Sequence, residues 1–169
     1  MNVIISNKYQ SLLANLDIDV IKSINGEFDV EEIVSNFTNF FFNKMIIDVT
    51  AIKNYQDINT FQQLSVGLDM NKIILLLDDS EIVNSPMFLS QLVSMGIYNF
   101  TRNIDAVKFL IDNPNSYKDV AHIQQLNTLS STINEKVMSG NQVIGIRNIT
   151  DHAGSTTLIY MLKKELEQF

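Results

Sequence analysis

Up to about residue 113, short apolar runs alternate with longer segments of helical periodicity. The apolar runs have the length of strands and span residues 2–6, 19–24, 45–49, 72–77 and 97–100. The run IILLL within residues 72–77 is apolar at every position, which is typical of a central strand covered on both faces. The alternation of strands with helices predicts a parallel α/β domain.

The segments between these runs carry apolar residues three or four positions apart, as one face of a helix does. Such stripes fall within residues 30–37, 58–68, 88–93 and 106–111, and residues 8–16 supply the remaining helix. Pro86 stands where a helix is expected to begin. Five strand and helix units result, and the Asn113-Pro114 pair marks their end.

A different pattern follows this boundary. Apolar residues recur every three or four positions from Val120 to Val137, which predicts a long amphipathic helix that Ser139-Gly140 ends. Residues 143–166, VIGIRNITDHAGSTTLIYMLKKEL, are typical of a strand, a turn and a helix. One strand and one helix cannot bury their apolar faces alone, so we expect this tail to dock on the first domain, a second protomer or further chain. The predicted divisions are residues 1–113, 114–140 and 141–169.

Composition narrows the classes of function. The chain of 169 residues is 46% apolar, which suffices for a core, and it has no cysteine, which excludes disulfides and thiolate metal sites. Its 12 basic and 19 acidic residues give a net charge of -7, which disfavours nucleic acid as a partner. The sequence shows no signal peptide and no apolar run of the ~20 residues that a membrane helix needs. We therefore expect a cytoplasmic protein with no cofactor and no membrane insertion.

Polar residues stand at the ends of the apolar runs. Asp48 is the second-last residue of the third run, Asp78 and Asp79 follow the fourth, and Arg102 follows the fifth. In this pattern and spacing, residues 1–113 resemble the receiver domain of bacterial response regulators. The resemblance implies a flavodoxin/CheY-like, doubly wound parallel sheet of five strands in the order 2-1-3-4-5, followed here by a C-terminal helix-strand-helix extension.

The receiver family has a phosphoacceptor Asp at the end of its third strand, and Asp48 occupies that position. The family's acidic pair after the first strand, which binds Mg²⁺, is replaced here by Ser6 and Asn7. Mg²⁺ usually relies on carboxylates in an octahedral oxygen shell, so Asp48 alone would hold it poorly. Where the family has a small Ser/Thr after the fourth strand, this chain has Asp78 and Asp79, whose negative charge would repel a phosphoryl group. Arg102 stands at the position of the family's Lys.

Two interpretations of Asp48 remain open: a phosphoacceptor, or a strand-end carboxylate bonded to a neighbouring loop or to Arg102. We favour the second interpretation. Arg102 is expected to pair with Asp48 or Asp78. Asp78 and Asp79 also suit the start of a helix, where carboxylates are favoured. The three phenylalanines at 40–42 are assigned to the core, with exposure of part of the run to a partner as the alternative.

The turn RNITDHAGSTT near the C-terminus resembles a degenerate P-loop of the ParA/MinD group. Gly154 takes the place of the last glycine of that loop, and Thr156 takes the place of its Mg²⁺-binding Ser/Thr. Ser155 stands where the loop has its Lys, and Thr150 stands where the group has an earlier Lys. No ammonium group would therefore reach the phosphates, and hydrolysis of a nucleotide is not expected.

Asp151 and His152 replace the two earlier glycines, and Asp151 adds negative charge where phosphate oxygens would lie. Weak anion binding remains an alternative, because Ser155, Thr156 and Thr157 open a helix whose first N–H groups are unpaired. We favour the interpretation that Thr156 or its neighbour is an N-terminal cap. His152 is interpreted as a solvated loop residue.

The order of these parts is similar to that of TadZ/CpaE-type pilus-assembly proteins, in which an atypical receiver precedes a ParA-like domain. The resemblance implies a non-enzymatic pseudo-receiver that forms a homodimer or docks on a pilus or secretion machine, and that is recruited to a membrane-associated or polar complex. The alternatives are a phosphorylatable receiver that uses Asp48 and a nucleotide-binding fragment of a ParA-like protein.

Overall fold

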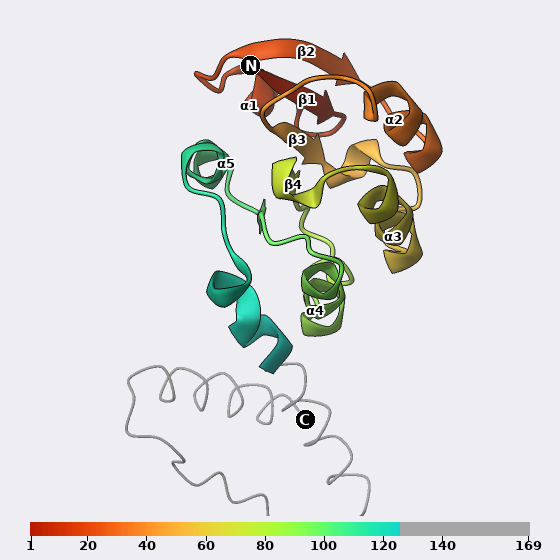
Figure 1. The fold of residues 1–169 in the computed structure, drawn as a ribbon, viewed down its shortest axis with the longest axis vertical. Coiled ribbons are helices and arrows are strands. Elements are labelled where there is room, and N and C mark those ends of the chain that lie inside the picture. Colours follow the sequence, from red (N-terminus) through yellow and green to blue (C-terminus); the bar gives the residue numbers. More distant parts are fainter. Residues whose placement is uncertain (126–169) are drawn as a thin grey trace, which may run out of the picture. The chain divides into compact units, whose positions relative to one another are not determined.

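Five parallel strands form one sheet in the order β2-β1-β3-β4-β5 (Figure 1). This computed structural model describes residues 1–125, and the predicted strand and helix of the tail lie outside them. The strands are β1 (Asn2–Ser6), β2 (Val20–Asn25), β3 (Met45–Asp48), β4 (Ile73–Leu76) and β5 (Phe100–Thr101). Their order confirms the predicted flavodoxin/CheY-like fold.

Helices cover both faces of the sheet, as a parallel sheet requires. The elements are α1 (Gln10–Ala14), α2 (Val30–Phe37), η1 (Val49–Ala51), α3 (Ile58–Gly67), η2 (Met70–Lys72), α4 (Pro86–Ser94) and α5 (Ile104–Asp112). On one face, α2, α3 and α4 bury apolar side chains such as Phe37, Phe61 and Phe88 against the strands. On the other face, α1 and α5 contribute Leu13 and Val107 to a smaller cluster. Within residues 1–125, no helix is long and apolar enough to cross a membrane.

The fifth strand lies later in the chain than the sequence predicts. The apolar run at 97–100 suggested a strand from Ile97, but β5 is Phe100–Thr101. Gly96, with φ +83, ends α4, and its N–H donates to the carbonyl of Val93. The N–H of Ile97 donates to the carbonyl of Leu92, which completes a Schellman motif. Ile97 is therefore buried as part of the C-terminal cap of α4 and not as part of a strand, because an apolar residue is favoured at this position of the motif.

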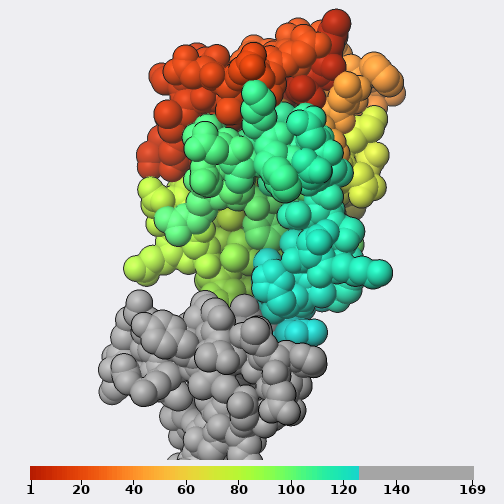
Figure 2. Space-filling model, turned by 90° about the vertical axis from the view of Figure 1, so that its left-hand side faces the viewer, coloured from red at the N-terminus to blue at the C-terminus, as the bar shows by residue number. Residues whose placement is uncertain are grey.

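The chain beyond α5 turns back onto the end of the sheet. The N–H of Asn115 donates to Oδ1 of the buried Asn99 at 2.7 Å, and its amide donates to the carbonyl of Tyr98 at 3.1 Å. Residues 117–125 are helical, and Val120 is buried. Figure 2 shows α5 and residues 114–125 as a continuous teal to cyan surface. The predicted boundary at Asn113 thus precedes a segment that contacts the sheet domain.

The three phenylalanines before β3 differ in burial. Phe42 is buried and Phe40 is partly buried against the larger core cluster. Phe41 is 83% exposed, so its assignment to the core was wrong. Neighbours in an extended segment point in opposite directions, and anchoring Phe40 and Phe42 leaves Phe41 facing outward.

Candidate functional site

Asp48 lies at the carboxyl end of β3, and its side chain is fully buried. Its Oδ1 accepts hydrogen bonds from the N–H of Thr50 at 2.9 Å and from the Thr50 hydroxyl at 2.7 Å. Its Oδ2 accepts hydrogen bonds from the N–H of Asn7 at 3.0 Å and of Tyr9 at 2.9 Å. A carboxylate offers about four lone-pair sites, and the chain itself fills that number here.

These bonds join the loop after β1 to the loop after β3. Asp48 caps η1 through the N–H two residues ahead, a local bond that Asp side chains make readily. The Thr50 hydroxyl also accepts a hydrogen bond from the N–H of Lys8 at 3.1 Å, and the amide of Asn7 donates to the carbonyl of Thr50 at 2.9 Å. Ser6 is buried beside them, and its hydroxyl has no hydrogen-bond partner within the described residues. Asn7 therefore contributes to the site through its backbone as well as its side chain.

The loop after β4 holds a second buried carboxylate. Asp78 accepts a hydrogen bond from the Tyr55 hydroxyl at 2.8 Å and from the N–H of Ser80 at 3.2 Å. The bond to Asp78, followed by partial burial and the carboxylate charge, raises the pKa of Tyr55 above its ordinary value of 10.0. Asp78 therefore joins the loop after β4 to the segment that precedes α3.

Arg102 pairs with Asp79 instead of the predicted Asp48 or Asp78. Its guanidinium donates to Oδ1 of Asp79 at 2.8 Å, and both side chains are exposed. The hydrogen bond and the charge of Arg102 lower the pKa of Asp79. Because the pair is exposed, we expect it to contribute little to stability.

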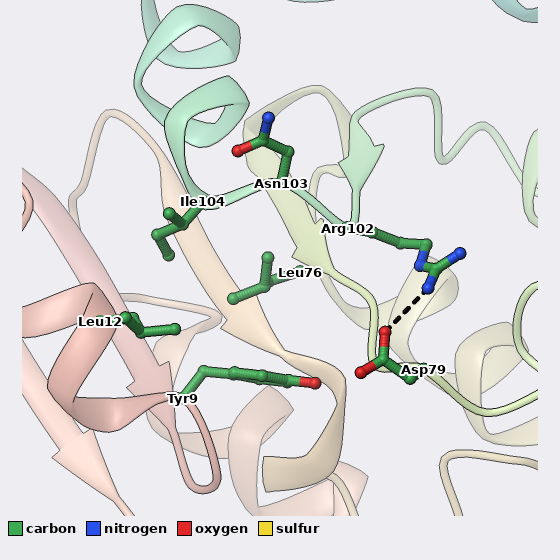
Figure 3. A pocket seen from close by; sticks show the side chains of 7 residues that line it. All are labelled: Tyr9, Leu12, Leu76, Asp79, Arg102, Asn103 and Ile104. Atoms are coloured by element: carbon green, nitrogen blue, oxygen red, sulfur yellow. Dashed lines mark hydrogen bonds and ion pairs between the residues drawn. The ribbon is translucent and has the colours of Figure 1, made fainter.

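An open groove lies beside this ion pair, with a volume of about 480 Å³ (Figure 3). Its lining comes from the loop and helix after β1, the end of β4 with the loop that follows it, and the loop after β5 with the start of α5. The lining residues are Tyr9, Leu12, Leu76, Asp79, Arg102, Asn103 and Ile104. The groove is walled mainly by apolar side chains, and Asp48 is not among those that line it.

The fold thus brings Ser6, Asn7 and Asp48 together at the carboxyl edge of the sheet, with Asp78 and Arg102 on neighbouring loops. No group of three or more His, Asp or Glu side chains in residues 1–125 could hold a metal ion. The remaining predicted positions lie outside the described residues. They are Thr150, Asp151, His152, Gly154, Ser155, Thr156 and Thr157.

Sequence reasoning missed Tyr9, Thr50 and Tyr55. A weak signal existed for Thr50, because a threonine two residues after an Asp suits a local turn in which the carboxylate accepts the N–H. Tyr9 donates its backbone N–H to Asp48, and the type of side chain at position 9 gives no signal for such a bond. The bond from Tyr55 to Asp78 joins two loops separated by α3 and β4.

Comparisons with protein-family models, with curated proteins and with solved structures gave no match for this chain. The fold and the site therefore define its class. It is a CheY-like α/β domain whose carboxylate at the end of β3 is buried and accepts hydrogen bonds from two loops of its own chain.

Proposed function

We propose that this protein is a non-catalytic pseudo-receiver, an interaction module in which Asp48 holds two loops together instead of accepting a phosphoryl group. The observation that carries this proposal is the set of four hydrogen bonds to the Asp48 carboxylate. Phosphorylation needs one carboxylate oxygen as a nucleophile, and Mg²⁺ needs oxygen lone pairs as ligands. Either event would first have to break bonds to buried backbone N–H groups, which is costly.

The surroundings of Asp48 support the same proposal. Ser6 and Asn7 supply no carboxylate where the receiver family binds Mg²⁺. Asp78 places a buried carboxylate near the position where an incoming phosphoryl group would need a donor. The resemblance to TadZ/CpaE-type proteins suggests the cellular role of such a module. The module would form a homodimer or dock on a pilus or secretion machine, and it would be recruited from the cytoplasm to a membrane-associated or polar complex.

Phosphorylation is the competing function, because Asp48 does lie at the carboxyl end of β3. The test is incubation of the full chain with acetyl phosphate and Mg²⁺, followed by intact-mass measurement, and NMR with beryllofluoride and Mg²⁺. We expect no added mass and no shift of the amides of Asn7, Tyr9 and Thr50. Asp79→Asn is the control for modification of an exposed carboxylate. A phosphoryl group located on Asp48 by fragmentation would replace the pseudo-receiver by a phosphorylatable receiver.

Nucleotide binding is tested separately, because it concerns the tail. Calorimetry of the full chain with ATP and Mg²⁺ should give no binding heat, since the turn at 150–157 has no Lys for the phosphates. Micromolar binding that Thr156→Ala abolishes would contradict this expectation. It would assign a nucleotide to the turn and make the chain part of a ParA-like protein.

A further inference from the structure

The amino edge of the sheet, opposite the edge that holds Asp48, exposes an aromatic side chain. The loop between α2 and β3 presents Phe41, which is 83% exposed. Its neighbours fix the loop, because Phe40 and Phe42 pack edge-on against Phe37 with ring centroids 5.6 and 6.3 Å away. Phe41 therefore projects from an anchored segment. Aromatic side chains, phenylalanine among them, are enriched at protein–protein interfaces.

Three lysines surround this loop. The ammonium of Lys22 lies 5.1 Å from the ring centroid of Phe37, and that of Lys72 lies 5.8 Å from the ring centroid of Phe41. The ammonium of Lys44 donates to the backbone carbonyl that precedes Lys72, at 2.7 Å. The first two contacts hold Lys22 and Lys72 beside aromatic rings, and the third holds the Lys44 ammonium against the residue that precedes Lys72.

The charges of these lysines are not neutralised by ion pairs. None of the ion pairs within residues 1–125 involves Lys22, Lys44 or Lys72. Partial burial lowers the pKa of Lys44, the charge of Asp69 opposes this effect and the charge of Lys72 adds to it. The recorded pairs are the N-terminal ammonium with Asp19, Lys53 with Asp29, Arg102 with Asp79, and Lys108 with Asp17. Asp69 acts on Lys44 and Asp19 pairs with the N-terminal ammonium, but the three lysines still leave an excess of positive charge here in a protein of net charge -7.

The apolar part of this surface extends beyond Phe41. The N–H of Asn43 donates to the carbonyl of Met1 at 3.0 Å, so the start of the chain lies against the same loop. Met1 is 58% exposed. We call the surface formed by Met1, Lys22, Phe41, Lys44 and Lys72 the amino-edge patch. It combines exposed apolar side chains with cations, and it lies on the edge of the sheet away from the Asp48 site.

We propose that the amino-edge patch binds an acidic segment of a partner protein, in which an apolar residue covers Phe41 and carboxylates meet the three lysines. This inference deepens the proposed function and rests on it, because it names the chemistry of the partner of the module. Charge complementarity favours such a partner. Burial of the aromatic side chain would supply affinity, and the lysines would supply orientation.

An anionic bilayer is the other surface that lysines and an exposed phenylalanine suit. The net charge of -7 opposes it, since a negative surface repels the molecule as a whole. The attraction of three lysines to such a surface is weak and acts only within about a Debye length. A small acidic segment, in contrast, contacts the patch without approaching the remaining negative charge.

The test uses the full chain, labelled with ¹⁵N, and a synthetic peptide of glutamate and leucine residues as the probe. We expect the peptide to shift the backbone amides of residues 38–45 and 70–73, and higher salt to weaken binding. Phe41→Ser should weaken binding about tenfold or more, the factor for losing a buried aromatic contact. Phe109→Ser is the matched control, because Phe109 is also exposed but lies on α5. It should leave binding unchanged.

Four outcomes would overturn the inference. The first is that the acidic peptide shifts no amide of the patch. The second is that a peptide with lysine in place of glutamate binds equally well. The third is that Phe41→Ser binds the acidic peptide as the wild type does. The fourth is that phosphatidylserine-containing vesicles bind the patch and the peptide does not. A phosphoryl group found on Asp48 would overturn the proposed function instead, so the two failures are distinguishable.

Discussion

Asp48 joins two loops that are distant in the sequence, and each of its oxygens accepts two hydrogen bonds. The donors are the N–H groups of Asn7, Tyr9 and Thr50 and the hydroxyl of Thr50. Because the carboxylate is buried, water cannot replace it for these donors. The residue is therefore expected to stabilise the carboxyl edge of the sheet.

Asp48→Asn should lower the free energy of unfolding by about 2–4 kcal/mol, measured by urea denaturation. The amide can accept through only one atom, so its NH₂ group would face donors and leave at least one buried N–H unpaired. Asp79→Asn is the control, because Asp79 is an exposed carboxylate at the same edge of the sheet, and it should change stability little. Equal stability of Asp48→Asn and the wild type would contradict the structural role.

Tyr55 gives a pH-dependent prediction. Its hydroxyl donates to Asp78, which raises the pKa of Tyr55 in the folded protein. The stability from this bond is therefore fully present below the unfolded pKa of 10.0 and is lost as the pH rises through the folded pKa. Tyr55→Phe should cost about 1 kcal/mol near neutral pH, and its difference from the wild type should narrow above about pH 10. Urea titrations across this range that show a constant difference would contradict the assignment.

At the scale of elements, α2 and α3 approach closely at Gly67, the last residue of α3. A Cβ built at this position would collide with Cγ1 of Val34 and lie 2.8 Å from its Cγ2. Gly67→Ala should therefore lower the free energy of unfolding by about 1–3 kcal/mol in thermal or urea denaturation, because one helix must shift.

The double variant Gly67→Ala/Val34→Ala tests the cause of that loss. Val34→Ala removes the methyl groups that the new Cβ would meet. The double variant should therefore lose less free energy of unfolding than the two single variants lose together. Additive losses would show that the contact between the helices is not responsible.

The sequence predicted the elements better than it predicted their contacts. The apolar run at 2–6 predicted β1 at its observed bounds, and the resemblance to receivers predicted the order of the sheet. It misplaced β5, since the apolar residue Ile97 packs at the end of α4 and the same letters fit a strand. Side-chain polarity drew attention to Asp48, but all three of its partner residues donate backbone N–H groups, which every residue except proline has, and only Thr50 adds a side-chain donor. The partner of Arg102 depended on the path of a loop, which no local pattern specifies.

At the scale of the whole molecule, charge sets the solution behaviour. The excess of acidic residues gives an isoelectric point of about 4.7. Charge repulsion between molecules vanishes near that pH, so light scattering should show the greatest association of the full chain there and less as the pH rises toward neutrality. Association that grows from pH 4.7 toward neutral pH would contradict the prediction.

The two outer strands of the sheet, β2 and β5, differ in how accessible they are to another strand. The strand β5 has two residues, and the chain after α5 returns beside it through Asn115. The strand β2 has six residues, most of them exposed, and no strand of residues 1–125 pairs with its outer side. A long outer strand can pair with a strand of another molecule, and a lysine in the outer strand opposes such pairing. If two sheets of this protein ever fuse, or a fibril starts from it, β2 is the edge at which growth begins, and Lys22 is the residue that restrains it.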